Sequence, residues 1–280
     1  MNVSQLYIYP VKSLGGIALN TVTVTDRGFE YDRRWMLVDE NNRFVSQREV
    51  AEIALLQVEL QSDGLKVFHK KNVSNCITIP FLPSIDETMV VDIWDVKCDA
   101  RLVSTEADTW FSTVLNFPVK LVYMPDSTRV KIDDRYATSS NDITSFSDGY
   151  PILMISEASM LDLNNKLEQH LPIDRFRPNL VFAGGEPFVE DTMKEFTING
   201  CTFFGVKPGT RCVITTINQE TGEKGKEPLK TLSDYRRKDT KVYFGENVIA
   251  GGTGIINIGD SITILQTKEG IFNSHAASQV

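Results

Sequence analysis

Cys212 stands in a sequence setting that suits nucleophilic or metal chemistry. The segment 207–212 (KPGTRC) places the cysteine after a Pro-Gly turn and directly after Arg211, at the predicted start of an apolar strand over 212–217. An arginine beside a thiol stabilises the thiolate, which is the form that acts as a nucleophile or a metal ligand. A single cysteine at a strand start is more often a small buried hydrophobic residue, so both interpretations stay open on this segment alone.

Basic residues recur near turns, where they could together form a pocket for a polyanion. The stretch 207–241 holds nine Lys and Arg against five Asp and Glu, a local excess of four positive charges. Other turns carry Lys12-Ser13, Asp32-Arg33-Arg34 and Arg175-Phe176-Arg177-Pro178-Asn179. Arginine forks bind phosphates and planar carbonyl or amide edges, and Ser or Asn adds neutral donors. The alternative is that these segments are solvated loops with surface ion pairs, and the residues alone leave it open.

Several common chemistries are excluded because their motifs are missing. The sequence has no GxSxG elbow, P-loop or HExxH, and no GxGxxG after a predicted strand. The three histidines are scattered, and the four cysteines, at 76, 98, 201 and 212, match no zinc, iron–sulfur or CxxC spacing. The glycine run 251–254 (GGTG) precedes an alternating strand pattern, which predicts a turn rather than a phosphate cradle at a helix start.

Composition and charge indicate a soluble globular protein. The 280 residues carry 29 Lys and Arg against 37 Asp and Glu, a formal charge of −8, and 41% of them are hydrophobic. This length allows one large domain or two smaller ones. An acidic chain does not favour a nucleic-acid binder that contacts phosphates over a broad basic surface. No apolar run reaches the roughly 18 residues of a membrane helix, and the first residues lack a secretory signal pattern, so we expect a cytoplasmic protein without a membrane segment.

The elements that position these residues are predicted to be mostly strands. Apolar and β-branched runs between turn clusters predict strands over 5–10, 18–25, 34–39, 44–47, 55–60, 65–69, 90–94, 97–103, 179–182, 196–198, 202–206, 212–217, 241–243 and 261–266. One helix is predicted to begin with Thr105 as its cap and to end at Pro118, and a second to begin at Ser156 and to end before Pro172. The polar stretch 124–148 is predicted to be a linker or a long functional loop. The fold class is thus mainly β with a few helices (α+β), as two β-barrel units joined near residue 125.

Six short segments follow one another along the chain in a characteristic order. They are LYIYPVKS at 6–13, Asp32-Arg33 with Trp35 and then VSQR at 45–48, Ser147-Asp148 with PILMISEAS at 151–159, FRPN at 176–179, TRCVITT at 210–216 and PLKTLSDYR at 228–236. In order and spacing this set resembles the MOSC-domain molybdenum enzymes with an N-terminal β-barrel, such as the mitochondrial amidoxime-reducing component and its bacterial relatives. The resemblance implies an N-terminal β-barrel domain over 1–122, packed on a MOSC β-barrel domain over 123–268, and a tail over 269–280.

For the site, the resemblance implies a molybdenum cofactor (Mo-molybdopterin), with Cys212 as the protein ligand to the metal. A soft thiolate suits a metal that is already bound by sulfur. The implied cofactor-binding residues are Lys12, Ser13, Arg33, Ser147, Arg177, Asn179, Thr210 and Arg211. An acidic protein needs such a concentrated positive pocket to hold the phosphate of the cofactor. Because a carboxylate near this pocket can have a shifted pKa, Asp148 is the candidate proton donor that joins Cys212 in catalysis.

The activity implied by the resemblance is the reduction of N-hydroxylated compounds such as amidoximes, hydroxylamines and N-hydroxylated base analogues. No cysteine-rich ferredoxin segment follows the second domain, so electrons are expected from a separate reductase or a ferredoxin-like protein. The expected partners are that protein and a small-molecule substrate, with no nucleic acid and no membrane. Two other classes stay open: a carrier of the molybdenum cofactor, and a sulfur-transfer protein that uses Cys212 as a persulfide. A barrel that binds no cofactor is a third alternative.

Overall fold

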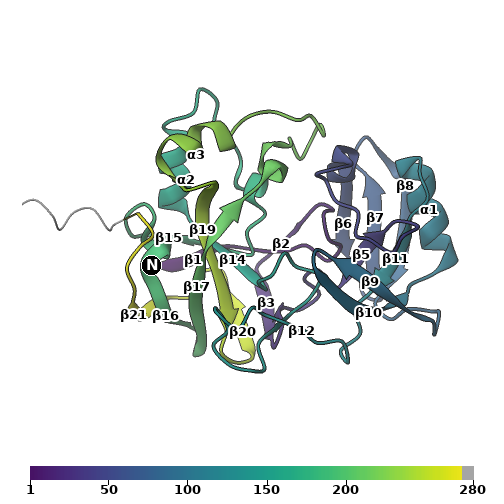
Figure 1. The fold of residues 1–280 in the computed structure, drawn as a ribbon, viewed down its shortest axis with the longest axis horizontal. Helices are drawn as coiled ribbons and strands as arrows, with labels where there is room; N and C mark the ends of the chain where they lie inside the picture. The colour runs from purple at the N-terminus through teal and green to yellow at the C-terminus, as the bar shows by residue number, and fades with distance from the viewer. Residues whose placement is uncertain (273–280) are drawn as a thin grey trace, which may run out of the picture.

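Strands dominate the computed structural model, which describes residues 1–272 (Figure 1). Figure 1 shows two bodies side by side, one built on a large sheet and the other mostly on the strands of residues 35–123. The α-helices of the described chain are α1 (Thr105–Leu115), α2 (Glu157–Asn164) and α3 (Leu229–Tyr235). The expected mainly β fold with a few helices is confirmed. Of the predicted tail over 269–280, residues 273–280 lie outside the described chain.

The larger body is organised around a nine-stranded sheet. Its strands follow one another in space as β2 (Ile17–Leu19), β1 (Asn2–Ile8), β15 (Leu180–Ala183), β14 (Ile152–Ser156), β19 (Lys241–Ala250), β17 (Cys201–Arg211), β16 (Met193–Ile198) and β21 (Ile262–Thr267), with β18 (Arg237–Lys238) paired to β19. The fully buried rings of Phe182, Phe196 and Phe203 lie in its core. Because β1 pairs antiparallel with β15, the N-terminal residues belong to the sheet of the second half of the chain.

The smaller body contains two antiparallel sheets and α1. One sheet has the order β5 (Trp35–Val38), β11 (Lys120–Tyr123), β10 (Val96–Leu102) and β9 (Thr88–Ile93), and the other β6 (Leu56–Leu60), β7 (Gly64–His69) and β8 (Asn72–Pro80). Trp35 and Phe111 are completely buried in the core between them. Two small sheets complete the fold. One is β20 (Gly254–Asn257) with β3 (Thr21–Thr25) and β4 (Gly28–Phe29), which packs on the core of the large sheet, and the other is β12 (Val130–Lys131) with β13 (Ile143–Thr144).

Helix α1 forms where the local sequence predicts it, with one difference at its cap. The side chain that accepts the hydrogen bond at the N-terminus is that of Ser104, from the backbone N–H of Ala107 at 3.1 Å, and not that of Thr105. Asn116 ends the helix in the left-handed conformation, and Ala107 and Phe111, one turn apart, are buried. None of the helices within residues 1–272 is long and apolar enough to cross a bilayer.

The predicted strand over 212–217 is wrong. Strand β17 ends at Arg211, and Val213–Thr216 forms a 3-10 turn that begins directly after Cys212. The hydroxyl of Thr215 donates to the carbonyl of Cys212 at 2.9 Å, and that of Thr216 donates to the carbonyl of Val213 at 2.8 Å. Such local hydrogen bonds favour a turn over an extended strand. The cysteine therefore follows a strand instead of starting one.

Other predicted elements differ in extent. Helix α2 ends at Asn164, well before Pro172, because the Asn164 side chain donates to the Leu171 carbonyl at 3.1 Å and accepts from the Leu171 N–H at 2.9 Å. The predicted strand over 44–47 is wrong, since only an isolated bridge at Phe44 forms before a turn. The remaining 3-10 turns are Ala51–Leu55, Ile173–Phe176 and Val189–Thr192. The exposed strand β8 and helix α3 have no counterpart among the predicted elements.

A buried cluster of charged residues supports the large sheet from the side of α3. Arg236 Nη2 lies 2.5 Å from Asp191 Oδ2, and Lys268 Nζ lies 2.5 Å from Glu246 Oε1 on β19. Glu190 is fully buried beside them. Burial of Glu246 outweighs its ion pair with Lys268 and raises the pKa of this carboxyl to about 8.

We expect the free energy of unfolding to fall as the pH rises from about 5 to 8, and to fall less steeply in the Glu246→Gln variant. The ordinary pKa of Glu is 4.5, so between that value and about 8 the native protein keeps a proton that the unfolded chain has released. Raising the pH through this window then favours unfolding by up to about 1.4 kcal/mol per pH unit. Urea unfolding of both proteins at three pH values measures the slopes. Equal slopes would contradict the assignment.

Candidate functional site

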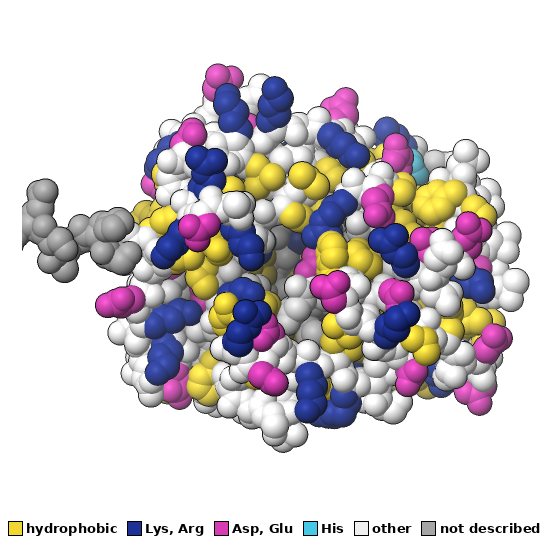
Figure 2. All heavy atoms as spheres, viewed as in Figure 1, with side chains coloured by type: hydrophobic (Ala, Val, Ile, Leu, Met, Phe, Trp, Pro, Cys, Tyr) yellow, Lys and Arg dark blue, Asp and Glu magenta, His cyan; other side chains and the backbone are white. Residues whose placement is uncertain are grey.

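A cavity of about 620 Å³ opens between the two bodies and is visible as the hollow near the centre of the face in Figure 2. Its volume is in the range of small-molecule and cofactor sites, roughly 300 to 1,000 Å³. All of the residues predicted for the site line it: Lys12, Ser13, Arg33, Ser147, Asp148, Arg177, Asn179, Thr210, Arg211 and Cys212. Their separate roles in binding and catalysis stay predictions.

The cavity is strongly basic. Its lining contains eight basic side chains, those of Lys12, Arg33, Arg48, Arg175, Arg177, Lys207, Arg211 and Lys241. In the described part of the chain, Asp148 supplies the one carboxylate of this lining. In a chain with a formal charge of −8, this concentration of positive charge attracts anions to one place.

Backbone hydrogen bonds tie together the three N-terminal and loop segments that supply the site. The N–H of Arg33 donates to the carbonyl of Tyr9 at 2.9 Å, and the N–H of Phe146 donates to the carbonyl of Arg33 at 3.0 Å. The N–H of Lys12 donates to the carbonyl of Trp35 at 2.8 Å. The turn after β1, the turn before β5 and the loop before β14 are therefore held in register beside the cavity.

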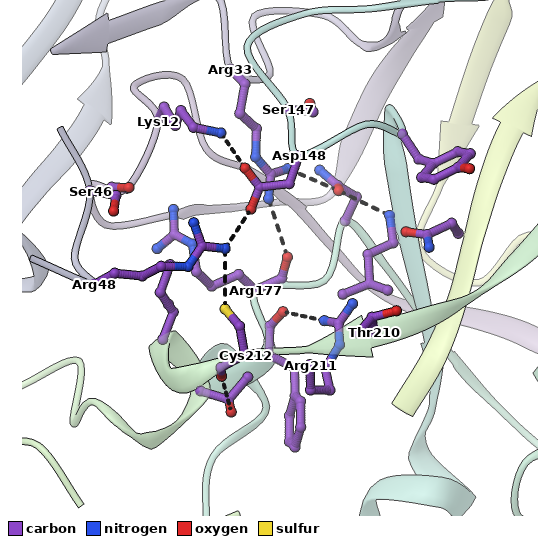
Figure 3. Close-up of a pocket in the computed structure, with 18 of the residues that line it drawn as sticks. Lys12, Arg33, Ser46, Arg48, Ser147, Asp148, Arg177, Thr210, Arg211 and Cys212 are labelled. Carbon is purple, nitrogen blue, oxygen red and sulfur yellow. Dashed lines mark hydrogen bonds and ion pairs between the residues drawn. The ribbon is translucent and has the colours of Figure 1, made fainter. Parts of the chain in front are cut away.

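Asp148 is the centre of an ionic network in the cavity (Figure 3). Its Oδ1 lies 2.5 Å from Lys12 Nζ and accepts from Trp94 Nε1 at 3.1 Å, and its Oδ2 lies 3.5 Å from Arg48 Nη2. Burial alone would raise the pKa of Asp148, but Lys12 and Arg48 outweigh it and hold that pKa well below its ordinary value. The carboxyl is therefore ionised at neutral pH, which favours a role in orienting the two cations over the predicted donation of a proton.

The thiol of Cys212 lies beside a guanidinium. Arg48 Nη2 donates to Cys212 Sγ at 3.3 Å, so the same group contacts both the thiol and Asp148 (Figure 3). Cys212 is half-buried and forms no disulfide. Within residues 1–272, no set of three or more His, Cys, Asp or Glu side chains is arranged to hold a metal ion.

Arg211 turns back onto the backbone next to the cysteine. Its Nε donates to the carbonyl of Gly209 at 3.2 Å and its Nη1 to that of Phe176 at 3.4 Å. Burial lowers the pKa of the Arg211 guanidinium to about 10, so it still carries its charge at neutral pH. Irregular pairing of β17 with β19 around Lys207 and Thr210 turns these side chains toward the cavity, as bulges do at functional sites.

Two arginines of the cavity lining pack on the ring of Tyr9. The guanidinium carbons of Arg33 and Arg177 lie 4.3 and 4.2 Å from the ring centroid. Arg33 Nη1 also lies 2.7 Å from Asp32 Oδ2 and donates to Asn179 Oδ1 at 2.9 Å. Asn179 Nδ2 donates to Asp32 Oδ1 at 2.9 Å, so both polar atoms of Asn179 already hold this network.

Arg177 carries an unused donor. Its Nη2 is buried and has no hydrogen-bond partner among residues 1–272, and burial lowers the pKa of its guanidinium to about 10. Buried polar groups are almost always hydrogen-bonded, so an orphan donor on a cavity wall indicates a ligand acceptor. A phosphate or a pterin carbonyl has the chemistry to accept from it, and the donor set therefore fits an anionic, heterocyclic cofactor.

Backbone strain concentrates at the same wall. Ser13, Arg33 and Arg177 have φ angles of 71°, 48° and 55°, in the left-handed region that residues with a side chain rarely adopt. Conformations of this kind cluster at ligand sites, where the surrounding structure holds them in place. All three residues were predicted to bind the cofactor.

Among the lining residues that reasoning from the sequence missed, Arg48 and Trp94 contact the predicted ones. Arg48 lies in the VSQR segment of the resemblance, but no role was derived for it. Trp94 is the last residue of the predicted strand over 90–94 and is next to a charged residue, Asp95, which gives no functional signal. Both come from the smaller body, and only the packing of the bodies brings them to Cys212.

Comparisons with known proteins match nearly the whole chain. The family model of the MOSC N-terminal beta barrel domain matches residues 1–118, and that of the MOSC domain matches residues 141–263. Mitochondrial amidoxime reducing component 2 of Rattus norvegicus is 30% identical over 93% of this chain and 82% of its own length, and mitochondrial amidoxime-reducing component 1 of Mus musculus is 29% identical over 94% and 82%. A molybdenum cofactor sulfurase of Oryza sativa subsp. japonica is 31% identical over 88% of this chain. The chain spans 32% of the length of that plant protein.

Proposed function

The chain belongs to the MOSC family, with an MOSC N-terminal β-barrel domain before the MOSC domain, and on this basis we propose that it is a molybdenum-cofactor-dependent reductase of N-hydroxylated compounds. The observation that carries the proposal is the meeting of a half-buried cysteine with eight basic side chains in one cavity of cofactor size. The similarity to amidoxime-reducing components over most of both chains supports the reaction class. We place the reaction in the cytoplasm.

The residues of the cavity divide between the parts of the cofactor. Cys212 would provide a thiolate ligand to molybdenum, which suits the soft sulfur environment of that metal. The orphan donor of Arg177 and the charges of Lys12, Arg33 and Arg211 would hold the phosphate and the pterin edge, with Ser13, Ser147 and Thr210 as neutral donors. When bound, the cofactor supplies the two-electron reduction that removes the hydroxyl oxygen as water.

The charged side chains of the cavity orient one another beside Cys212. Asp148, as an anion, orients Lys12 and Arg48, and Arg48 in turn fixes the side chain of Cys212 through its 3.3 Å contact. Burial lowers the pKa of Lys12, so the ammonium would release a proton more easily than an exposed lysine does. Because Lys12 lines the cavity and its Nζ lies 2.5 Å from Asp148 Oδ1, we propose Lys12 Nζ, in place of Asp148, as the group that holds the proton. Electrons come from a separate reductase or a ferredoxin-like protein.

The experiment that tests this function is a turnover assay on protein purified from a host that makes the cofactor. Benzamidoxime is the substrate, and dithionite-reduced methyl viologen replaces the unidentified electron donor. We expect conversion to benzamidine at many turnovers per chain. Absence of turnover in protein that contains molybdenum would contradict the proposal.

The alternatives are a cofactor carrier and a sulfur-transfer protein with a persulfide on Cys212. The second has one observation in its favour, the 31% identity to a molybdenum cofactor sulfurase over 88% of the chain. A carrier would pass its cofactor to a cofactor-free acceptor enzyme without reducing benzamidoxime. A sulfur-transfer protein would release about one thiocyanate per chain on treatment with cyanide, and a Cys212→Ala variant would release none.

A further inference from the structure

Lys207 and Lys241 are basic residues of the cavity lining to which the proposed chemistry assigns no role. Lys207 lies on β17 and is half-buried, and Lys241 is exposed at the start of β19. Within residues 1–272, ion pairs hold three other cations of the lining, Lys12, Arg33 and Arg48, but neither of these two lysines. The two ammonium groups are therefore available to a ligand.

Aromatic rings hold the Lys207 ammonium in place. Its Nζ lies 4.3 Å from the ring centroid of Tyr136 and 5.3 Å from that of Tyr150, and the two rings meet edge to face at 6.0 Å. A ring face attracts a positive charge without neutralising it. The carboxylate that acts on Lys207, that of Asp133, is bound by Arg135 at 2.5 Å. The charge of Lys207 is thus fixed in position and is not taken up by an acid.

The two lysines also act on each other. Burial lowers the pKa of the Lys207 ammonium, and the charge of Lys241 lowers it further. Like charges that line one cavity repel each other, and a bound anion removes that repulsion. A phosphate monoester carries about −1.5 to −2 charges at neutral pH, so two ammonium groups match it better than they match a carboxylate. Lysine is also a common point-charge ligand of phosphate.

This pair of lysines is separate from the arginines proposed to hold the cofactor. Arg177 and Arg33 pack on the ring of Tyr9, and Arg33 is among the charges that act on the Arg177 guanidinium. The charges that act on Lys207 come instead from its partner lysine and from residues 133 and 135. Two basic clusters therefore line the cavity, and the cofactor phosphate needs only one of them.

We propose that Lys207 and Lys241 bind a phosphate group of the substrate. The site then prefers N-hydroxylated compounds that carry a phosphate monoester, such as the nucleotide of an N-hydroxylated base, over their uncharged counterparts. This inference rests on the proposed function. The phosphate takes no part in the reaction, in which cleavage of the N–O bond consumes two electrons from the donor protein and two protons and yields the amine and water. The lysines thus determine which substrate is held.

The test compares N-hydroxycytidine with N-hydroxycytidine 5′-monophosphate, which differ only in the phosphate. The variants are Lys207→Gln, Lys241→Gln and the double variant, which keep polar side chains and remove the charges. Lys194→Gln is the matched control, because Lys194 is exposed on β16 of the same sheet and does not line the cavity. The molybdenum and pterin contents of each protein are measured together with kcat and KM.

We expect kcat/KM of the wild type to be about tenfold higher for the monophosphate than for the nucleoside. Each single variant should lose about threefold toward the monophosphate, mainly through KM, and the double variant should lose the whole preference. Toward the nucleoside all variants should stay within about twofold of the wild type, and Lys194→Gln should keep the preference.

Three results would overturn the proposal. The first is a wild type that does not prefer the monophosphate. The second is a double variant that keeps the preference or loses activity equally toward both substrates. The third is loss of pterin from the double variant while Lys194→Gln stays loaded, because it would assign the lysines to the phosphate of the cofactor.

A binding measurement separates this inference from the proposed function. If the wild-type protein reduces neither substrate, the proposed function fails, and calorimetric titration with cytidine 5′-monophosphate and with cytidine decides the role of the lysines. Tighter binding of the monophosphate to the wild type and to Lys194→Gln that is lost in the double variant supports the phosphate site. Equal binding of the two compounds, or a preference that survives in the double variant, overturns it.

Discussion

Replacement of Cys212 by alanine is expected to lower the reduction of benzamidoxime by at least about a hundredfold. Loss of a group that only supports a metal ligand already reduces activity or metal affinity about 10- to 100-fold, and loss of the ligand itself should have no smaller effect. Because Cys212 is half-buried and lies directly after the end of β17, we expect the alanine variant to fold normally, so that the loss of activity reports the loss of the thiol. Steady-state assays with an artificial electron donor measure the loss.

Cys76→Ala is the control for the loss of a thiol. Cys76 is exposed on β8, and it does not line the cavity. We expect this variant to keep wild-type activity and the same midpoint of thermal unfolding. Wild-type activity in Cys212→Ala would remove the cysteine from the mechanism and contradict the assignment of the metal ligand.

Replacement of Arg177 by alanine is expected to weaken retention of the cofactor by about 10- to 100-fold. A hydrogen bond between charged groups contributes about 1.5 to 3 kcal/mol, and Nη2 of Arg177 is a buried charged donor of the lining that has no partner among residues 1–272. The variant also removes one of the two guanidiniums that pack on Tyr9. Release of the pterin during dilution and gel filtration, measured by fluorescence after oxidation, gives the relative retention.

Arg129→Ala is the matched control for the loss of an arginine. Arg129 is half-exposed, and its nearest carboxylate is that of Asp26 at 3.7 Å, outside the cavity. A surface pair of this kind contributes little, so retention and stability should not change. Equal retention in Arg177→Ala and in Arg129→Ala would mean that the orphan donor does not contact the cofactor.

Local signals in the sequence are sufficient to predict some secondary-structure elements and not others. Helix α1 could be predicted because its periodicity and its capping region lie within one short segment. The turn after Cys212 could not, because the apolar and β-branched residues of 213–217 have the composition of a strand, and the hydroxyls of Thr215 and Thr216 decide the conformation. The pairing of β1 with β15 joins residues far apart in the chain, which no local pattern reports.

The residues of the candidate site also divide into those that the sequence could predict and those that it could not. Cys212 and the arginines next to turns could be singled out by residue type, and the resemblance then predicted that they share one pocket. Arg48 and Trp94 could not, because their importance comes only from contacts with Asp148 and Cys212 across the two bodies. The ionisation of the Asp148 carboxyl could not be predicted either, because it depends on Lys12 and Arg48, which are distant in sequence.

The measurement that tests the central claim most directly is the molar ratio of molybdenum to protein. Elemental mass spectrometry would determine it for wild-type protein purified from a host with an active cofactor pathway, beside Arg177→Ala prepared in the same way. We predict a ratio near one for the wild type and a clearly lower ratio for the variant. A wild type without molybdenum would contradict the assignment of the cavity as a molybdenum cofactor site.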